Sequence, residues 1–144
     1  MAKLIDTCTH ELMDTAPKIM QAIRVEMRRG RGADISIPQF RSLAFIQRNP
    51  DSTLSNLAEH MGLTLPSVSK LIDGLVKQKL VVRQESRTDR RCLTLVLTQT
   101  GASIVDSARA GTHANLAKKL ESLSADELET ISQAMKLLRP IFVG

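Results

Sequence analysis

The chain has 144 residues, of which 42% are hydrophobic, so it is long and apolar enough for one folded domain with a substantial core. Only 2% of the residues are aromatic, which argues against single-stranded nucleic-acid modules that stack bases on rings. The formal net charge of +5 favours a polyanionic partner, and most of the excess lies in residues 38–98, which carry nine Lys or Arg and five Asp or Glu.

The two cysteines, Cys8 and Cys92, are far apart in the sequence and fit neither a disulfide framework nor a metal site. The N-terminal residues lack the apolar segment of a secretory signal peptide, and no apolar run approaches the length of a membrane span. We therefore expect a cytoplasmic protein with no membrane association, no metal and no cofactor.

Apolar residues at steps of three and four predict a helix over residues 4–29. Pro17 interrupts this pattern, so either the helix kinks there, or one helix ends near Asp14 and another begins with Pro17 in its first turn. The glycine-rich segment 28–32 ends this helical region.

A second helix is predicted from residue 36 onwards. Ser36 can cap it, Gln39 can complete a capping box, and Pro38 is tolerated in the first turn. Residues 48–53 predict a turn, and Thr53 is a plausible cap for the helix that follows.

Residues 54–73 have the spacing of a helix-turn-helix. Ala58 is small enough for a second helix to approach closely, and Gly62 supplies the positive φ that a sharp turn needs. Thr64 is expected to cap the second helix, with Pro66 in its first turn. The apolar residues predicted to pack the two helices together are Leu57, Leu63, Val68 and Leu71.

The N-terminal end of this second helix offers small and basic side chains. Ser67 and Ser69 can approach base edges without a clash, and Lys70 can reach a purine acceptor or a phosphate. An ordinary helix surface is the alternative, but contact with DNA is the better interpretation in a basic segment. The candidate DNA contacts on this helix are Thr64, Pro66, Ser67, Ser69 and Lys70.

Two β-rich runs, 80–86 and 92–98, flank a charged turn and predict an antiparallel hairpin. In the second run Leu93, Leu95 and Leu97 are predicted to form the buried face. A helix-turn-helix followed directly by a hairpin is a winged helix. The expected fold is therefore mainly α with a small β-hairpin wing.

The hairpin turn carries Arg87, Arg90 and Arg91 around a single acid, Asp89. A run of charges is usually a solvated surface. Here the hairpin would lie beside a helix in the major groove, so its tip could reach the neighbouring minor groove, whose negative potential attracts arginine. We expect Asp89 to hold an arginine side chain in one rotamer through a bidentate pair.

The C-terminal part is predicted to be helical, with Ser124 and Glu127 as a capping box and Pro140 ending the last helix. The terminal helices carry more apolar residues than one small domain needs, which favours burial against a second copy of the chain over packing against the middle segment. We divide the chain into an N-terminal dimerisation helix (1–34), a winged helix-turn-helix DNA-binding domain (35–98) and C-terminal dimerisation helices (99–144).

The segments SIPQFRSLAFI, LSNLAEHMGLTLPSVSKLIDGLVKQKLVVR and DRRCLTLVLTQTG resemble the multiple-antibiotic-resistance regulator (MarR) family of bacterial transcription factors, and the resemblance covers nearly the whole chain. It implies a homodimer with a helical base and two projecting winged helices. Such proteins are usually repressors that a small, often anionic or phenolic ligand or an oxidant releases from DNA. By motif position, Arg91 would be the minor-groove arginine, Asp89 its orienting partner, and Arg87 and Arg90 auxiliary phosphate contacts.

The resemblance also implies a ligand cleft between the dimer base and the winged helix. The candidate ligand contacts there are Met20, Arg24, Phe40 and Phe45, although core packing explains Met20 and both phenylalanines equally well. A branch of the family senses organic hydroperoxides with a reactive cysteine near the N-terminus and tyrosines nearby. Cys8 has a suggestive position, but the chain contains no tyrosine.

The leading hypothesis is thus a ligand-responsive, dimeric repressor that binds a pseudo-palindromic DNA site. One alternative is a winged helix that serves as a protein-interaction module without DNA binding, since fold does not fix function. Another is a thiol-based redox-sensing regulator that uses Cys8. An enzyme is not expected, because the sequence offers no nucleophile–base constellation, no paired acids in an apolar setting and no phosphate-binding glycine loop.

Overall fold

The computed structural model describes residues 1–32 and 34–142. These residues form, in chain order, α1 (Ala2–Gly30), α2 (Ile37–Arg48), α3 (Leu54–Met61), α4 (Leu65–Lys77), β1 (Val81–Glu85), β2 (Leu93–Leu97), α5 (Gln99–Leu120) and α6 (Ala125–Leu138). The predicted fold class, mainly helical with a small antiparallel hairpin, is confirmed.

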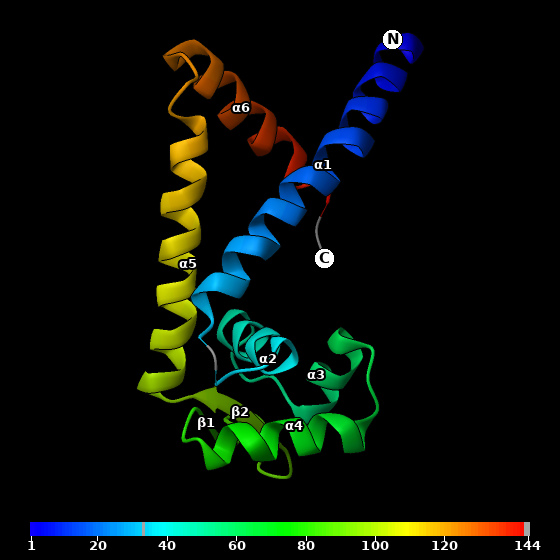
Figure 1. Ribbon diagram of the computed structural model, residues 1–144. Coiled ribbons are helices and arrows are strands. Elements are labelled where there is room, and N and C mark those ends of the chain that lie inside the picture. The colour runs from blue at the N-terminus through cyan, green and yellow to red at the C-terminus, as the bar shows by residue number, and fades with distance from the viewer. Residues whose placement is uncertain (33, 143–144) are drawn as a thin grey trace.

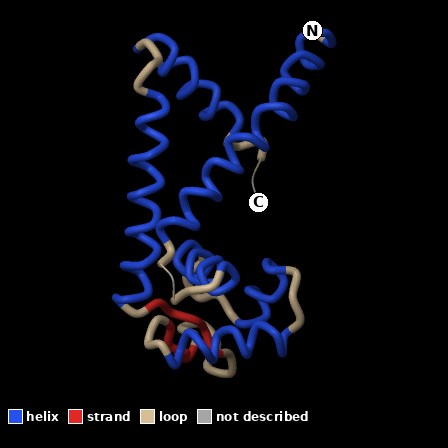
Figure 2. Tube along the Cα trace, in the orientation of Figure 1, coloured by secondary structure: helices blue, strands red, loops and turns tan. Residues whose placement is uncertain are grey.

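The segment from α2 to β2 forms a lobe at the bottom of Figure 1, and α1 and α5 rise from this lobe as two arms. From the far end of α5, α6 turns back toward α1. Figure 2 shows the hairpin at the lower end of the lobe, beside α4. None of the described helices combines the length and the apolar character that crossing a membrane requires.

The first helix passes through Pro17 without a break, so the alternative of two separate helices is wrong. Its C-terminal end packs closely against α5. A Cβ atom at Gly30 would lie 2.7 Å from the Cα atom of Ala108, so glycine is needed for this backbone contact. Beside it the buried Glu26 accepts a hydrogen bond from Asn115 at 2.6 Å, which adds a polar link between the two helices.

The helix caps form where the local sequence predicts them. Capping boxes or caps are present at Ser36–Gln39 (α2), Thr53 (α3), Thr64 (α4) and Ser124–Glu127 (α6). At α3 the box is completed by Asn56, whose side chain accepts from the Thr53 N–H at 2.9 Å. At α6 the hydrogen bonds from the backbone and side chain of Ser124 lower the pKa of the Glu127 carboxyl below its ordinary value.

The helix-turn-helix forms as predicted, with Gly62 in the left-handed region at φ 67°. Val68, Ile72 and Leu75 of α4 are fully buried against the lobe. Leu63 is 43% exposed, so its prediction as a packing residue is wrong. It directly follows the left-handed turn residue, and its side chain is directed outward rather than between the helices.

The hairpin pairs Val81 with Leu97 at its base and Glu85 with Leu93 near its tip. The predicted alternation along the second strand is only partly correct, because Leu93 is 53% exposed while Thr94 is 1% exposed. Leu93 lies in the strand pair nearest the hairpin tip and does not belong to the core cluster. Thr94 is covered because the chain before α3 forms an isolated β-bridge between Thr53 and Thr94. The Thr94 hydroxyl also donates to the carbonyl of Gln84 at 3.2 Å, which satisfies it in this buried position.

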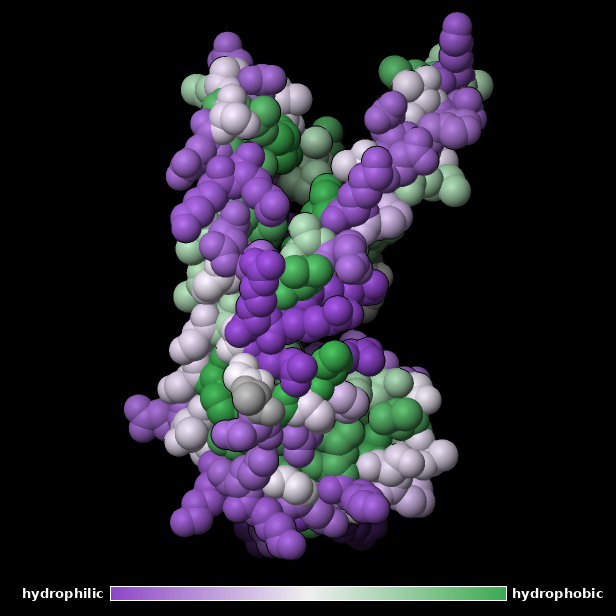
Figure 3. Space-filling view, viewed as in Figure 1, coloured by the Kyte–Doolittle hydropathy of each residue, from purple (hydrophilic) through white to green (hydrophobic). Residues whose placement is uncertain are grey.

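The terminal helices leave apolar side chains at the surface. Within the described part of α6 no residue is buried. The exposed large apolar residues of the two terminal helices include Leu4, Ile5, Met13, Ile19, Met20, Leu128, Ile131, Met135 and Leu137. Figure 3 shows hydrophobic residues at the surface of both upper arms. The division of the chain into three functional regions stays a prediction.

Candidate nucleic-acid interface

The N-terminal end of α4 presents the predicted contact residues at the surface. Thr64, Pro66, Ser67 and Lys70 are exposed, and Ser69 is half-buried. The Thr64 hydroxyl donates to Oγ of Ser67 at 2.8 Å and accepts from the Ser67 N–H at 3.3 Å. These two bonds hold both hydroxyl groups in place at the helix end.

Two leucines that the sequence analysis did not assign to this surface lie beside these residues. Leu63 is 43% exposed and Leu65 is 48% exposed, on either side of Thr64. Apolar side chains in a major groove can contact the methyl group of thymine. The signal in the sequence was the position of Leu65 in the first turn of α4, three residues before the first buried residue of that helix, Val68.

The wing tip holds Arg87, Arg90 and Arg91 fully at the surface. The turn is organised from inside by the buried Ser86, whose hydroxyl accepts from the N–H of Asp89 at 3.3 Å. The backbone of the turn is therefore ordered, and the three arginine side chains are exposed on it.

Asp89 does not form the predicted pair with an arginine side chain in the described structure, and that prediction is wrong. Its carboxylate instead accepts from the backbone N–H of Arg91 at 3.0 Å. An aspartate reaches the N–H two residues ahead without strain, so this local bond forms in preference to a guanidinium pair. Asp89 thus orders the backbone that carries Arg91, and the guanidinium of Arg91 has no ion-pair partner among the described residues.

An ion pair connects the two parts of the candidate interface. The guanidinium of Arg83, on β1, donates to the carboxylate of Asp73, on α4, at 2.5 Å. Figure 1 places α4 and the hairpin turn at the same lower end of the lobe, away from the arms. The pair therefore links the wing to the helix beside it.

This ion pair should contribute little to stability, because the side chains are 32% and 62% exposed. We expect a double-mutant cycle of Asp73→Asn and Arg83→Gln to give a coupling energy of about 0.2–1 kcal/mol in urea unfolding at low salt. The coupling should fall when the ionic strength is raised. A coupling of zero at low salt would show that the two side chains do not hold the wing and α4 together in solution.

A second candidate site is a cavity of about 460 Å³ between α1 and α2. It brings together two of the predicted ligand residues, Arg24 and Phe40. Met20 and Phe45 do not line it, because Met20 is one turn further along α1 and Phe45 faces another side of α2. Sequence reasoning missed the other arginines of the lining, which are Arg28, Arg31 and Arg41.

The two cysteines are both exposed, Cys8 on the free half of α1 and Cys92 at the wing. Across residues 1–32 and 34–142, no group of three or more His, Cys, Asp or Glu side chains is placed to hold a metal ion.

Residues 33–91, which contain the helix-turn-helix and most of the wing, match the sequence model of the MarR family. The HTH-type transcriptional regulator YfiV of Bacillus subtilis is 30% identical over 105 residues, which are 73% of this chain and 66% of YfiV. The match thus spans slightly less than two thirds of the length of that relative.

Solved structures share the fold over almost the whole chain. A MarR family protein from Bacillus stearothermophilus superimposes with a TM-score of 0.73 at 22% identity, over 96% of this chain and 94% of that one. A variant of S. aureus MepR bound to an oligodeoxyribonucleotide superimposes with a TM-score of 0.58 at 22% identity, over 98% of this chain and 97% of that one. S. aureus MepR bound to ethidium bromide superimposes with a TM-score of 0.67 at 21% identity, over 90% of this chain and 96% of that one. This chain is thus similar to the MarR family in the sequence of residues 33–91, and it shares the fold of MarR proteins over almost its whole length.

Proposed function

We propose that the protein is a dimeric, sequence-specific DNA-binding regulator of transcription, and that it acts as a repressor which a small molecule releases. The observation that carries the proposal is the position of the α4 surface and the arginine-tipped wing at one end of the lobe, joined by the Arg83–Asp73 pair. A recognition helix in the major groove and a wing tip in the adjacent minor groove are a compatible arrangement. MepR bound to an oligodeoxyribonucleotide supports this, since it has the same fold.

The proposal includes a homodimer because the terminal helices expose too much apolar surface for a solitary chain. Leu4, Ile5 and Met13 of α1 are 66%, 59% and 70% exposed, and α6 adds Leu137 at 71%. Large apolar side chains left exposed in this number are often covered by a partner. A second copy related by twofold symmetry would cover it and would set two copies of α4 about one DNA turn apart, roughly 34–36 Å.

The proposed effector is a small organic anion that binds in the cavity between α1 and α2. Four arginines, Arg24, Arg28, Arg31 and Arg41, line this cavity together with the ring of Phe40. Nε of Arg31 is buried and has no hydrogen-bond partner within the described chain. A carboxylate could accept from it, and the apolar lining could hold an aromatic ring.

A mobility-shift assay with the DNA upstream of the protein's own gene tests the proposal, with sedimentation on the free protein. We expect a dimer that binds this DNA, with log Kd rising linearly with log salt by about 0.9 per phosphate neutralised. Lys70→Ala should weaken binding, while Lys136→Ala, which removes an exposed charge from α6, should not. An intact dimer that gives no shift at low salt would instead support a protein-interaction module.

A further inference from the structure

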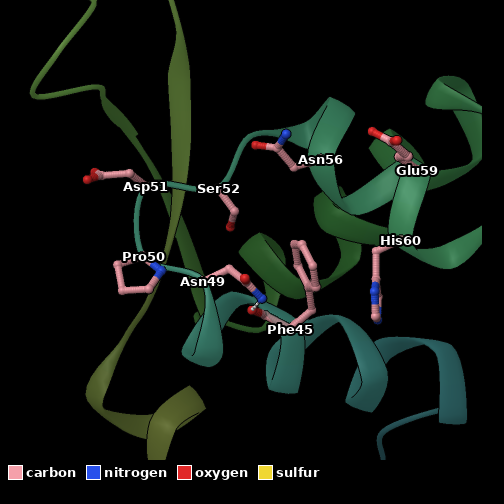
Figure 4. A pocket seen from close by; sticks show the side chains of 8 residues that line it. All are labelled: Phe45, Asn49, Pro50, Asp51, Ser52, Asn56, Glu59 and His60. Carbon is pink, nitrogen blue, oxygen red and sulfur yellow. Dashed lines mark hydrogen bonds between the residues drawn. The ribbon is translucent and has the colours of Figure 1, made fainter. Parts of the chain in front are cut away.

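A second hollow lies on the other side of α2, between its C-terminal end, the loop 49–52 and α3 (Figure 4). Its volume is about 420 Å³, and it shares no lining residue with the arginine-lined cavity. The ring of Phe45 forms one wall and is stacked against the ring of His60, with 4.5 Å between the centroids. We call this hollow the Ser52 pocket. It offers a flat aromatic surface next to a polar loop.

Ser52 gives this pocket a hydrogen-bonding group that the protein itself does not use. The residue is 4% exposed, and its Oγ has no hydrogen-bond partner within the described chain. Its backbone groups are both satisfied, because its N–H donates to the carbonyl of Asn49 at 3.2 Å and its carbonyl accepts from the N–H of Leu95 at 2.9 Å. Figure 4 shows the hydroxyl directed into the pocket, toward Phe45. A buried hydroxyl without a partner is unfavourable, and a ligand could satisfy it.

The charges around the pocket indicate the ligand. Two carboxylates, Asp51 and Glu59, belong to the lining, and no Lys or Arg does. Neither carboxylate forms an ion pair among the described residues. The side chain of Asn49 also belongs to the lining. The lining therefore has negative charge, hydrogen-bond acceptors and an aromatic face.

We propose that the Ser52 pocket binds a small planar organic cation, such as an amidinium or a protonated aromatic amine. The ring of the ligand would stack on Phe45, its N–H groups would donate to Oγ of Ser52, and the carboxylate of Glu59, elsewhere in the lining, would attract its positive charge. A cation near an aromatic face gains a further electrostatic attraction. This ligand class is opposite in charge to the one that the arginine-lined cavity would take.

Occupancy would act directly on the wing. The carbonyl of Ser52 accepts from the N–H of Leu95 on β2, and the next residue, Thr53, both caps α3 and bridges Thr94. Asp51 adopts a left-handed φ of 63°, which a residue other than glycine rarely does, so the loop is held in an unusual conformation. A ligand that bonds to Ser52 would therefore fix the position of β2 relative to α3. An effect on DNA affinity rests on the proposed function, whereas binding itself does not.

Benzamidine is a suitable probe, because it joins a phenyl ring to an amidinium group. We expect it to shift the backbone amide NMR signals of Ser52, His60 and Leu95 in the full-length protein, saturably and without DNA. Ser52→Ala and Glu59→Gln should each weaken this binding by about fivefold or more, the first through loss of a charge-assisted hydrogen bond and the second through loss of the attraction between opposite charges. Glu121→Gln, which removes an exposed carboxylate at the end of α5, should leave it unchanged.

Two matched ligands complete the experiment. Benzamide has the same shape without the charge and should bind at least about fivefold more weakly. Benzoate has the opposite charge and should shift signals around Arg24 and Arg31 instead. The inference is overturned if benzamidine and benzamide shift the Ser52 pocket equally, if Glu59→Gln binds benzamidine as tightly as the unchanged chain, or if benzamidine shifts only the arginine-lined cavity. Because DNA is absent, a failure here is distinct from a failure of the mobility-shift assay.

Discussion

Replacing Gly101 by alanine is expected to lower the free energy of unfolding by about 3 kcal/mol, the upper end of the range for overpacking a buried site. Gly101 is buried in the first turn of α5. A Cβ atom there would collide with the carbonyl oxygen of Leu80 and lie 3.1 Å from the carbonyl carbon. The same carbonyl accepts from the N–H of Thr98 at 3.0 Å, so it cannot move without loosening the junction between the hairpin and α5.

Urea unfolding followed by circular dichroism measures this effect, and the same helix supplies the control. Gly111 has no atom within 4 Å of the position that a Cβ would take. Gly111→Ala should therefore leave stability unchanged or raise it by about 0.5–1 kcal/mol through helix propensity. Equal effects of the two substitutions would mean that the contact between Gly101 and Leu80 does not constrain the fold.

The second large effect is expected at the wing. Arg91→Ala should reduce affinity for the protein's DNA site by about 1–3 kcal/mol, or roughly 5- to 150-fold, if Arg91 enters the minor groove. The guanidinium is exposed at the tip, and its backbone N–H is held by Asp89 at 3.0 Å. Asp89→Ala should weaken binding less, because it loosens the turn without removing the cation.

Titration of labelled duplex by fluorescence anisotropy at several salt concentrations distinguishes the roles of the wing arginines. Arg87→Ala and Arg90→Ala should lower affinity for all sequences alike and reduce the salt slope by about 0.9 each if they contact phosphates. Arg109→Ala, an exposed charge on α5, serves as the control. An Arg91→Ala variant that binds as tightly as the original chain would remove the wing from the DNA interface.

The sequence predicted best those features that depend on neighbours within a few residues. The caps at Ser36, Thr53 and Ser124 need only a hydroxyl and the N–H groups of the next turn, so they were visible in the sequence. The left-handed Gly62 was visible for the same reason. In contrast, the burial of Thr94 depends on a bridge to Thr53, 41 positions earlier, which no local pattern signals.

The candidate sites show the same limit. Phe40 and Phe45 are five positions apart on α2, so they point in different directions, and only Phe40 reaches the arginine-lined cavity. The arginines of that cavity come from α1, the residue after it and α2, and each taken alone looks like ordinary surface charge. The Ser52 pocket was not predicted, because an unpartnered hydroxyl is a property of the folded chain and not of the sequence.

The junction of α1 and α5 at Gly30 has a mechanical consequence. Backbone contact with Ala108 and the buried bond from Asn115 to Glu26 leave these two arms no room to slide past each other. In a twofold assembly α1 and α5 of each chain would thus move together as one rigid unit. The distance between the two copies of α4 could then change only through a rigid-body rotation of each lobe relative to its α1 and α5. The arginine-lined cavity lies between α1 and α2, where such a rotation would occur.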